Sequence, residues 1–181
     1  MSEPFSVPVT VRGYETDVQG HLNQSVYLNY AEHARWSLLK AAGITQAELI
    51  GSGVGPVALE TTIRYLRELL AGDEVEVTCA FEWGEGKTFR IRQTIRKQDG
   101  TVAAEITAVG GLMNLKERRL VANASEVLKG LATEPGLLKL RPAPVRARRR
   151  TPPAPRRCRP CCARPSRSGA AVSRATRGRP G

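Results

Sequence analysis

Residues 24–42 carry the strongest helical pattern in the chain. Apolar side chains recur there every three or four residues, as one buried face of an α-helix requires. These positions are Tyr27, Tyr30, Ala31, Ala34, Leu38, Ala41 and Ala42, and the opposite polar stripe holds Asn29, Glu32, His33 and Lys40. Asn23 is suited to cap the start of the helix, and Gly43 to end it in a left-handed conformation. The pattern predicts one helix that is nearly 30 Å long, at about 1.5 Å per residue.

Alternation of apolar and polar residues predicts strands on both sides of this helix. One strand precedes it at residues 7–11. Four strands follow it, around residues 57–65, 75–83, 89–96 and 102–108, and residues 123–131 are expected to form a short helix. The order of these elements predicts an α+β fold in which one long helix covers one face of an antiparallel sheet.

Two turns set the expected register of the last three strands. A three-residue Gly-Glu-Gly turn places Phe81 opposite Phe89. A two-residue Asp-Gly turn places Ile95 opposite Ala104. Both hairpins then keep their apolar residues on the same side of the sheet, which a slip of one residue would destroy.

Three arginines, Arg90, Arg92 and Arg96, share one face of a predicted strand and invite comparison with a phosphate site. In the expected register Arg96 faces Glu74, and Arg92 lies diagonal to Glu76. Cross-strand charge pairs therefore explain the arginines without a ligand. Glu60, on the preceding strand, is the other carboxylate to consider beside the motif described below.

Composition changes sharply after residue 140. Residues 1–140 hold 15 Lys and Arg against 17 Asp and Glu, whereas residues 141–181 hold 13 Arg and no acidic residue. The net charge of +11 therefore comes from the tail. The tail has no Phe, Tyr, Trp, Leu or Ile, so it lacks the residues for a core. We expect one domain at residues 1–140 and a disordered Arg/Pro/Ala-rich tail at residues 141–181.

Three interpretations of the tail stay open. Its arginines would bind nucleic acid or another anionic surface non-specifically, and we expect no other nucleic-acid partner. Cys158, Cys161 and Cys162 form a single C-x-x-C pattern, which is a weak zinc signal. The third interpretation is genetic. The codons of Arg, Pro, Ala and Gly, which dominate the tail, can begin with two G or C bases, as a shifted frame in GC-rich DNA would produce.

Residues 1–140 favour a cytoplasmic protein without a cofactor. Cys79 is the sole cysteine of this region, so we expect no disulfide framework. The chain has no apolar run of the length that a signal peptide or a transmembrane helix needs, and we expect no membrane partner. Because neither His/Cys ligand spacing nor a glycine-rich phosphate loop occurs here, we expect no metal ion either.

One segment, VRGYETDVQGHLNQSVYLNYAEHAR at residues 11–35, carries a dense motif. It resembles the signature D-x-x-G-H-x-N-x-x-x-Y-x-x-Y-x-E-x-A-R of the hotdog-fold thioesterases related to 4-hydroxybenzoyl-CoA thioesterase. The matching residues are Asp17, Gly20, His21, Asn23, Tyr27, Tyr30, Glu32, Ala34 and Arg35. The resemblance extends over about residues 5–130. It implies the hotdog fold, in which one antiparallel sheet wraps around a long central helix, and hydrolysis of an acyl thioester of coenzyme A or of an acyl carrier protein.

Asp17 and Gln24 are the predicted catalytic residues. Thioester hydrolysis needs a carboxylate that activates water or attacks the carbonyl itself, and the resemblance assigns this role to Asp17. The simpler interpretation is a loop aspartate that makes local turn bonds. The resemblance also implies that the backbone amide of Gln24, at the positive end of the helix dipole, donates to the thioester oxygen.

Four further motif residues are candidates for substrate binding: His21, Asn23, Tyr27 and Arg35. Each has a structural alternative. A loop histidine is more often structural than catalytic, and Asn23 is explained by its role as helix cap. Tyr27 fits a packing or interface position. Arg35 lies three residues after Glu32, close enough for the two to pair.

The resemblance leaves two alternatives to a carboxylate-dependent thioesterase. Some polyketide-associated relatives have no acid at the position of Asp17 and rely on residues matching Tyr27 and Arg35, so Asp17 favours the carboxylate route. The other alternative is an acyl-binding module that does not hydrolyse its ligand. In this family two subunits join their sheets edge to edge and both helices contribute to two sites, which implies a homodimer or homotetramer.

Overall fold

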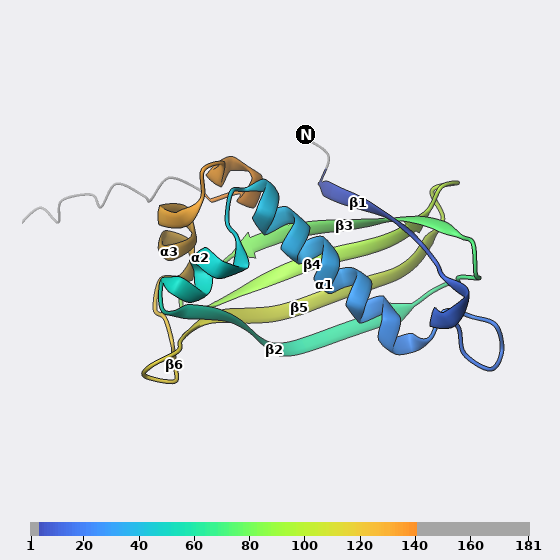
Figure 1. Ribbon diagram of the computed structural model, residues 1–181, viewed down its shortest axis with the longest axis horizontal. Helices are drawn as coiled ribbons and strands as arrows, with labels where there is room; N and C mark the ends of the chain where they lie inside the picture. Colours follow the sequence, from blue (N-terminus) through green and yellow to red (C-terminus); the bar gives the residue numbers. More distant parts are fainter. Residues whose placement is uncertain (1–3, 141–181) are drawn as a thin grey trace, which may run out of the picture. The chain divides into compact units, whose positions relative to one another are not determined.

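Helix α1 (Gln24–Ala41) lies across one face of an antiparallel sheet in the computed structural model, which describes residues 4–140 (Figure 1). Asn23 caps the helix, because its Oδ1 atom accepts a hydrogen bond from the Ser25 amide at 3.0 Å. Gly43 follows the helix in the left-handed region, with φ of 83°. A Cβ atom at Gly43 would lie 2.0 Å from Oγ1 of Thr133, so space as well as conformation requires glycine there. Both predicted ends of the helix are confirmed.

The buried face of α1 is the predicted one with two differences, since Leu39 is buried and Ala41 is exposed. The residues that it buries are Tyr27, Tyr30, Ala31, Ala34, Leu38 and Leu39, followed by Ala42 just beyond the helix. Ala41 is exposed, so its predicted place on this face is wrong. Near its end the helix is covered by the segment after α3, where the Thr133 amide donates to the carbonyl of Ala42 at 3.0 Å. Ala42 is buried at this contact, whereas Ala41 is exposed.

The sheet has the spatial order β1-β3-β4-β5-β2, and all of its neighbours are antiparallel. Its strands are β1 (Phe5–Thr10), β2 (Val54–Tyr65), β3 (Glu74–Trp83), β4 (Thr88–Lys97) and β5 (Val102–Asn114), and the short β6 (Arg119–Leu120) pairs with the end of β5. The chain thus runs from one edge, along α1, to the other edge, and then fills the middle with consecutive hairpins. This is the predicted α+β arrangement, a sheet curled around one long helix (Figure 1).

One of the two predicted registers is confirmed and the other is wrong. Between β4 and β5, Ile95 pairs with Ala104 as expected, but the predicted two-residue turn is wrong, because a bulge next to this pair puts Arg96 opposite Val102. Between β3 and β4, Phe81 pairs with Ile91 and not with Phe89. The connection is longer than the predicted three residues because it runs from Gly84 to Lys87. A shift of two residues keeps every side chain on its face, so the alternation pattern could not distinguish the two registers.

Each of the three arginines on the outer face lies opposite or diagonal to a glutamate, but of the three only Arg92 forms an ion pair among the described residues, and the partners differ from those predicted. Nε of Arg92 lies 2.7 Å from Oε1 of Glu82. Arg96 stands opposite Glu76 rather than Glu74. Because Arg92 and Glu82 are at the surface, their ion pair is a weak contributor to stability.

Three features of the chain were missed or misplaced by the sequence patterns. Helix α2 (Gln46–Gly51) follows Thr45, whose side chain and that of Glu48 form a reciprocal capping box. A bulge in β2 places Leu59 outside the regular pairing, and this residue is 51% exposed, although the alternation of residues 57–65 predicts that it shares the apolar face of Val57 and Ile63. The 3-10 turns η1 (Gly13–Glu15) and η2 (Pro135–Leu138) were also missed.

The final predicted helix is present as α3 (Ala124–Leu131). None of the helices in residues 4–140 is long and apolar enough to cross a membrane. The predicted disorder of residues 141–181 concerns a segment outside the described residues, and it stays a prediction.

Gln93 is the polar side chain buried within the apolar core of the described residues. Only 2% of Gln93 is exposed. Its Nε2 atom donates to the carbonyl of Ala31 at 2.7 Å, and its Oε1 atom accepts from Nη1 of Arg35 at 3.4 Å. Strand β4 is therefore bonded to the middle of α1, which fixes the helix on the sheet as well as packing it there.

Replacing Gln93 with alanine is expected to lower the free energy of unfolding by about 2–4 kcal/mol, because the variant loses a buried hydrogen bond and leaves a cavity. Urea unfolding followed by circular dichroism measures this change. Gln46→Ala, at an exposed position of α2, is the control and should stay within about 0.5 kcal/mol of the parent. Equal small effects of the two substitutions would show that Gln93 does not hold the helix on the sheet.

Asn23→Ala is expected to cost about 1 kcal/mol of stability, because the Ser25 amide loses its capping acceptor. Asn23→Asp keeps an oxygen at the same place and a negative charge at the helix N-terminus, so its unfolding free energy should remain close to that of the parent. The same urea titration compares the two. If both variants lose stability equally, the side-chain cap is not what stabilises the start of α1.

Candidate active site

The loop before α1 is a small closed hairpin. Thr16 and Leu22 form an isolated β-bridge, and the Asp17 amide donates to the carbonyl of His21 at 2.8 Å. At the neck of the hairpin, the Asn23 amide donates to the carbonyl of Glu15 at 2.9 Å. We call residues 15–23 the hairpin loop. It holds the predicted catalytic carboxylate on one arm and leads from the other arm directly into the helix.

Asp17 lies exposed on the first arm of the hairpin loop. Its Oδ1 atom accepts hydrogen bonds from the amides of Gln19, at 2.8 Å, and His21, at 3.2 Å. These are the local turn bonds that the simpler interpretation of Asp17 predicts. Both go to Oδ1, and Oδ2 accepts no hydrogen bond from residues 4–140. The carboxylate is therefore held in place by one oxygen while the other is available to a reactant.

Gln24 is the first residue of α1, immediately after the neck of the hairpin loop. Amides in the first turn of a helix have no acceptor within the helix, and the Asn23 cap satisfies that of Ser25. The Tyr65 hydroxyl donates to the Gln24 carbonyl at 3.1 Å and so fixes this residue from the end of β2. The structure thus brings Asp17 and the Gln24 amide to the same end of the helix.

Tyr27 is also at this end of the helix and is buried, with 3% of its surface exposed. Its ring meets that of Tyr65 edge to face, with centroids 5.1 Å apart. Burial raises the pKa of Tyr27, and the neighbouring Tyr65 and the charge of Asp17 act in the same direction. Asp17 and Tyr27 therefore lie within electrostatic reach of each other. Of the two interpretations of Tyr27, the packing role is the one that its ring has in this chain.

His21 is half-buried and forms an isolated β-bridge with Leu70, so the second arm of the hairpin loop is attached to the segment before β3. Sequence reasoning missed Tyr65, which contacts both Tyr27 and Gln24. Its position in an alternating strand marked it only as a packing residue, and no local signal shows which end of the helix it meets.

Arg35 lies apart from these residues within one chain. It is eleven residues beyond Gln24, about 16 Å further along the helix at 1.5 Å per residue. Its guanidinium donates to Gln93 and forms no ion pair with Glu32, so the suggested pairing of Glu32 with Arg35 is wrong. A side-chain acceptor within the sheet draws Arg35 inward, whereas Glu32 faces solvent.

Arg35 stands at a cavity of about 130 Å³ between the second half of α1 and the sheet. Its walls are mainly apolar: Trp36, Leu39, Leu49, Phe81, Phe89, Ile91, Ala108, Leu112 and Leu128 line it together with Glu32 and residues 56–58. Gly110 borders the cavity, and a Cβ atom there would lie 3.1 Å from the Phe89 ring and from the Val57 carbonyl oxygen. A dry cavity of about 150 Å³ in another protein holds benzene, so this one has room for roughly six carbon atoms.

The described residues contain no cluster of three or more His, Cys, Asp or Glu side chains arranged to hold a metal ion. Cys79 is a buried free thiol, and burial raises its pKa to about 12. A thiol that stays protonated at neutral pH is a poor nucleophile. The titratable side chains of the hairpin loop are Glu15, Asp17 and His21. Asp17 is the exposed one of the three, and its Oδ2 atom accepts no hydrogen bond within residues 4–140.

Comparison with known proteins gives relatives of one kind. The long-chain acyl-CoA thioesterase FadM of Escherichia coli is 27% identical over 124 residues, which cover 68% of this chain and 93% of that protein. The chloroplastic acyl-acyl carrier protein thioesterase ATL3 of Arabidopsis thaliana is 39% identical over 77 residues, 42% of this chain. That match spans only 40% of the plant protein.

Among solved structures, the probable thioesterase YbaW from Escherichia coli superposes with a TM-score of 0.62 and 26% identity, over 70% of this chain and 95% of its own. The likeness confirms the predicted hotdog fold. The family model of the thioesterase-like superfamily matches residues 11–155, which is well over half of the sequence. The chain therefore belongs to the thioesterase-like superfamily.

Proposed function

We propose that this protein hydrolyses acyl thioesters of coenzyme A or of an acyl carrier protein to the free acid and the thiol. The observation that carries the proposal is the carboxylate of Asp17, held through Oδ1 beside the N-terminus of α1 with Oδ2 available. The activities named for FadM and ATL3 support this class of substrate. We assign the activity to the cytoplasm, where a reducing environment suits the free thiol of Cys79.

In the proposed reaction, Asp17 takes a proton from a water molecule that attacks the thioester carbonyl, or attacks that carbonyl itself to form an anhydride that water then opens. The carbonyl oxygen gains negative charge in either case. The Gln24 amide, at the positive end of the α1 dipole, donates a hydrogen bond to this oxygen. The C–S bond then breaks, and the leaving sulfur becomes a thiol by taking a proton, from Asp17 in the first route and from water in the second.

The apolar cavity is the proposed site for the acyl chain, because its walls offer little except hydrophobic contact. Within one chain, however, it lies along the second half of α1, whereas Asp17 lies before the first turn. A complete site therefore needs the hairpin loop and the cavity to come from two different subunits.

The edge strand β2 supplies a geometry for this. It is twelve residues long, and a long exposed edge is a template for pairing with another strand. A two-fold axis pairs two β2 strands antiparallel, so the end at Tyr65 of one copy lies beside the start of the other. Because Tyr65 contacts Gln24 and residues 56–58 line the cavity, each hairpin loop then approaches the cavity of the partner.

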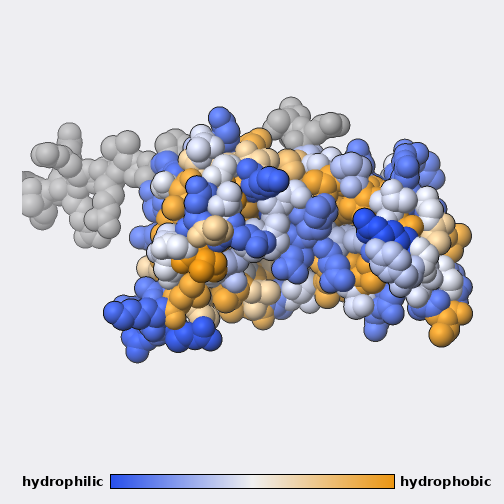
Figure 2. Space-filling model, viewed as in Figure 1, coloured by the Kyte–Doolittle hydropathy of each residue, from blue (hydrophilic) through white to orange (hydrophobic). Residues whose placement is uncertain are grey.

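Apolar side chains at the surface support this interface. Leu59 and Tyr65 on β2 are 51% and 48% exposed, and near the hairpin loop Val18 is fully exposed and Leu70 46%. Hydrophobic patches also reach the surface at the end of the molecule that carries this loop (Figure 2). Burying them against a second copy would stabilise a homodimer, and two such dimers would form the homotetramer that the family resemblance implies.

Asp17→Asn is expected to lower kcat about a hundred- to ten-thousandfold, because asparagine keeps the loop bonds but not the charge that takes a proton or attacks. KM should change little, since acyl group and thiol carrier are bound elsewhere. Thiol release from a panel running from acetyl-CoA to palmitoyl-CoA measures both constants.

Glu60→Gln, which removes an exposed carboxylate of β2, is the matched control and should retain most of the activity. A near-normal kcat in Asp17→Asn, with loss of activity in Tyr27→Phe or Arg35→Ala, would instead place the protein with the relatives that work without an acid. Binding of acyl-CoA without any thiol release would indicate the non-hydrolysing module.

Mixed dimers test the division of the site. The Asp17→Asn variant lacks the carboxylate, and in the Val57→Phe variant the larger side chain fills part of the cavity. The homodimer of either variant should therefore be weakly active. A dimer with one chain of each kind has one site with both defects and one with neither, and we expect about half of the parent activity. If loop and cavity belong to one chain, every site in the mixed dimer carries a defect and activity stays low. Light scattering that finds only monomer at micromolar concentration would contradict the interface itself.

A further inference from the structure

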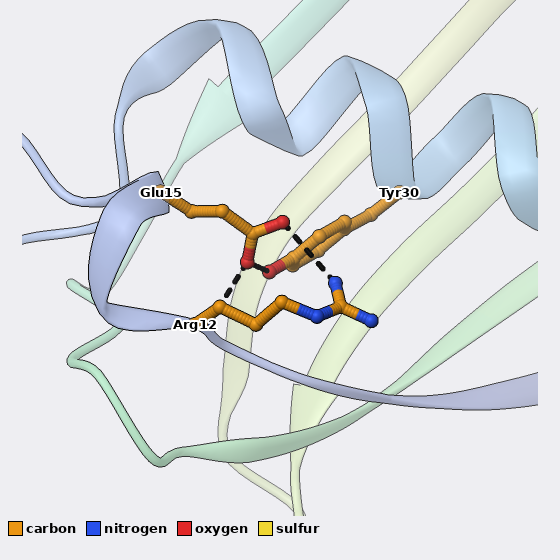
Figure 3. Close-up of polar contacts among 3 residues, drawn as sticks. All are labelled: Arg12, Glu15 and Tyr30. Atoms are coloured by element: carbon orange, nitrogen blue, oxygen red, sulfur yellow. Dashed lines mark hydrogen bonds and ion pairs between the residues drawn. The ribbon is translucent and has the colours of Figure 1, made fainter.

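Three residues near the hairpin loop form a polar cluster that the proposed reaction does not use. Oε2 of Glu15 accepts the Tyr30 hydroxyl at 2.5 Å and the Arg12 amide at 2.8 Å, and Oε1 accepts Nη1 of Arg12 at 3.2 Å (Figure 3). Arg12 follows β1, Glu15 ends η1, and Tyr30 lies in the second turn of α1. One carboxylate therefore connects three segments of the chain.

Two members of this cluster are buried or nearly so, whereas the side chain of Arg12 is 53% exposed. Tyr30 is 4% exposed, and the side chain of Glu15 is 12% exposed. A buried hydroxyl without an acceptor is costly, and Glu15 is the acceptor that Tyr30 has. Burial, and then the hydrogen bond to Glu15, raise the pKa of Tyr30 well above its ordinary value, so the phenol remains a donor throughout the neutral range.

Glu15 also closes the neck of the hairpin loop through its backbone, since its carbonyl accepts the Asn23 amide. The two arms of the loop are held differently. The second arm is attached to the segment before β3, where the Leu22 amide donates to the carbonyl of Leu69 at 2.7 Å. The first arm, which carries Asp17 two residues after Glu15, is attached to α1 through the side chain of Glu15.

We propose that Arg12, Glu15 and Tyr30 form a clamp that fixes the arm carrying Asp17 against α1, which makes Glu15 and Tyr30 positioning residues. The catalytic consequence rests on the proposed thioesterase function, whereas the effect on the loop does not. Glu15 and Asp17 divide the work: Glu15 bonds inward to the helix and Asp17 faces outward to a reactant.

Amide hydrogen exchange tests the clamp without reference to activity. Tyr30→Phe removes one hydroxyl and is expected to speed exchange at the amides of Asp17, Gly20 and Asn23 by about tenfold, with the amides of β4 unchanged. The control is Tyr14→Phe, which also removes one tyrosine hydroxyl. Tyr14 directly precedes Glu15 and is 81% exposed, so its substitution should leave exchange at the same amides unchanged. Unchanged loop exchange in Tyr30→Phe overturns the clamp whatever the activity shows.

Kinetics on the best acyl-CoA of the panel test the positioning of Asp17. Tyr30→Phe is expected to lower kcat about tenfold with little change in KM, because misplacement affects the chemical step. In the Asp17→Asn background the same substitution should cost nothing further, since groups that act through one residue are not additive. Glu15→Gln keeps an oxygen acceptor and should lose less activity than Glu15→Ala.

The outcomes separate the two proposals. An equal loss from Tyr30→Phe in both backgrounds, or none in either, overturns the positioning of Asp17 by the clamp. Full activity of Asp17→Asn overturns the carboxylate mechanism of the proposed function. In that case the exchange of the loop amides still decides whether the clamp exists.

Discussion

The close packing of α1 on the sheet is the constraint on which the other features depend. Ala31 and Ala34 are completely buried beneath the helix, and such small side chains let its backbone approach the strands. Gln93 reaches the Ala31 carbonyl from β4 only because of this approach. With the middle of the helix fixed, its N-terminus falls beside the hairpin loop, and its second half stands over the small residues Ala108 and Gly110, where the cavity forms.

The features that the sequence predicted correctly are those determined by a few residues adjacent in sequence. The Asn23 cap belongs to this class, because a cap is specified by adjacent residues. The Asp-Gly signal placed the turn between β4 and β5 correctly, but not its length, because a bulge puts Arg96 opposite Val102. The register of β3 with β4 was wrong since an even shift leaves the same residues buried. Helix α2 had a capping signal at Thr45 and Glu48 that could have revealed it.

The sequence predicted which candidate residues lie together at the start of α1, but not what surrounds them. Asp17 and Gln24 are neighbours because the motif lies within one short segment, and their catalytic roles belong to the proposed function. Tyr65 and the cavity arise from contacts between elements far apart in sequence, for which alternation gives only a face. Gln93 had left a visible sign, because it interrupts the apolar series Phe89, Ile91 and Ile95 on one face of β4. A polar residue in such a series needs a partner, and the sequence could not say that this partner is a helix carbonyl.

The hairpin loop contains two carboxylates, Glu15 and Asp17, that have different roles in the proposed site: Glu15 holds the loop on α1, and Asp17 reacts. Burial alone raises the pKa of Glu15, but the hydrogen bonds from Tyr30 and Arg12 and the charge of Arg12 outweigh it and hold the pKa below its ordinary value. A group whose pKa is lowered by folding contributes stability that is fully present above its unfolded pKa and is lost as pH falls through the folded one. The clamp is therefore charged and intact at neutral pH. Asp17 bonds to its loop only through Oδ1, and in the proposed reaction the other oxygen meets the reactant while the bonds of Glu15 keep the loop in place.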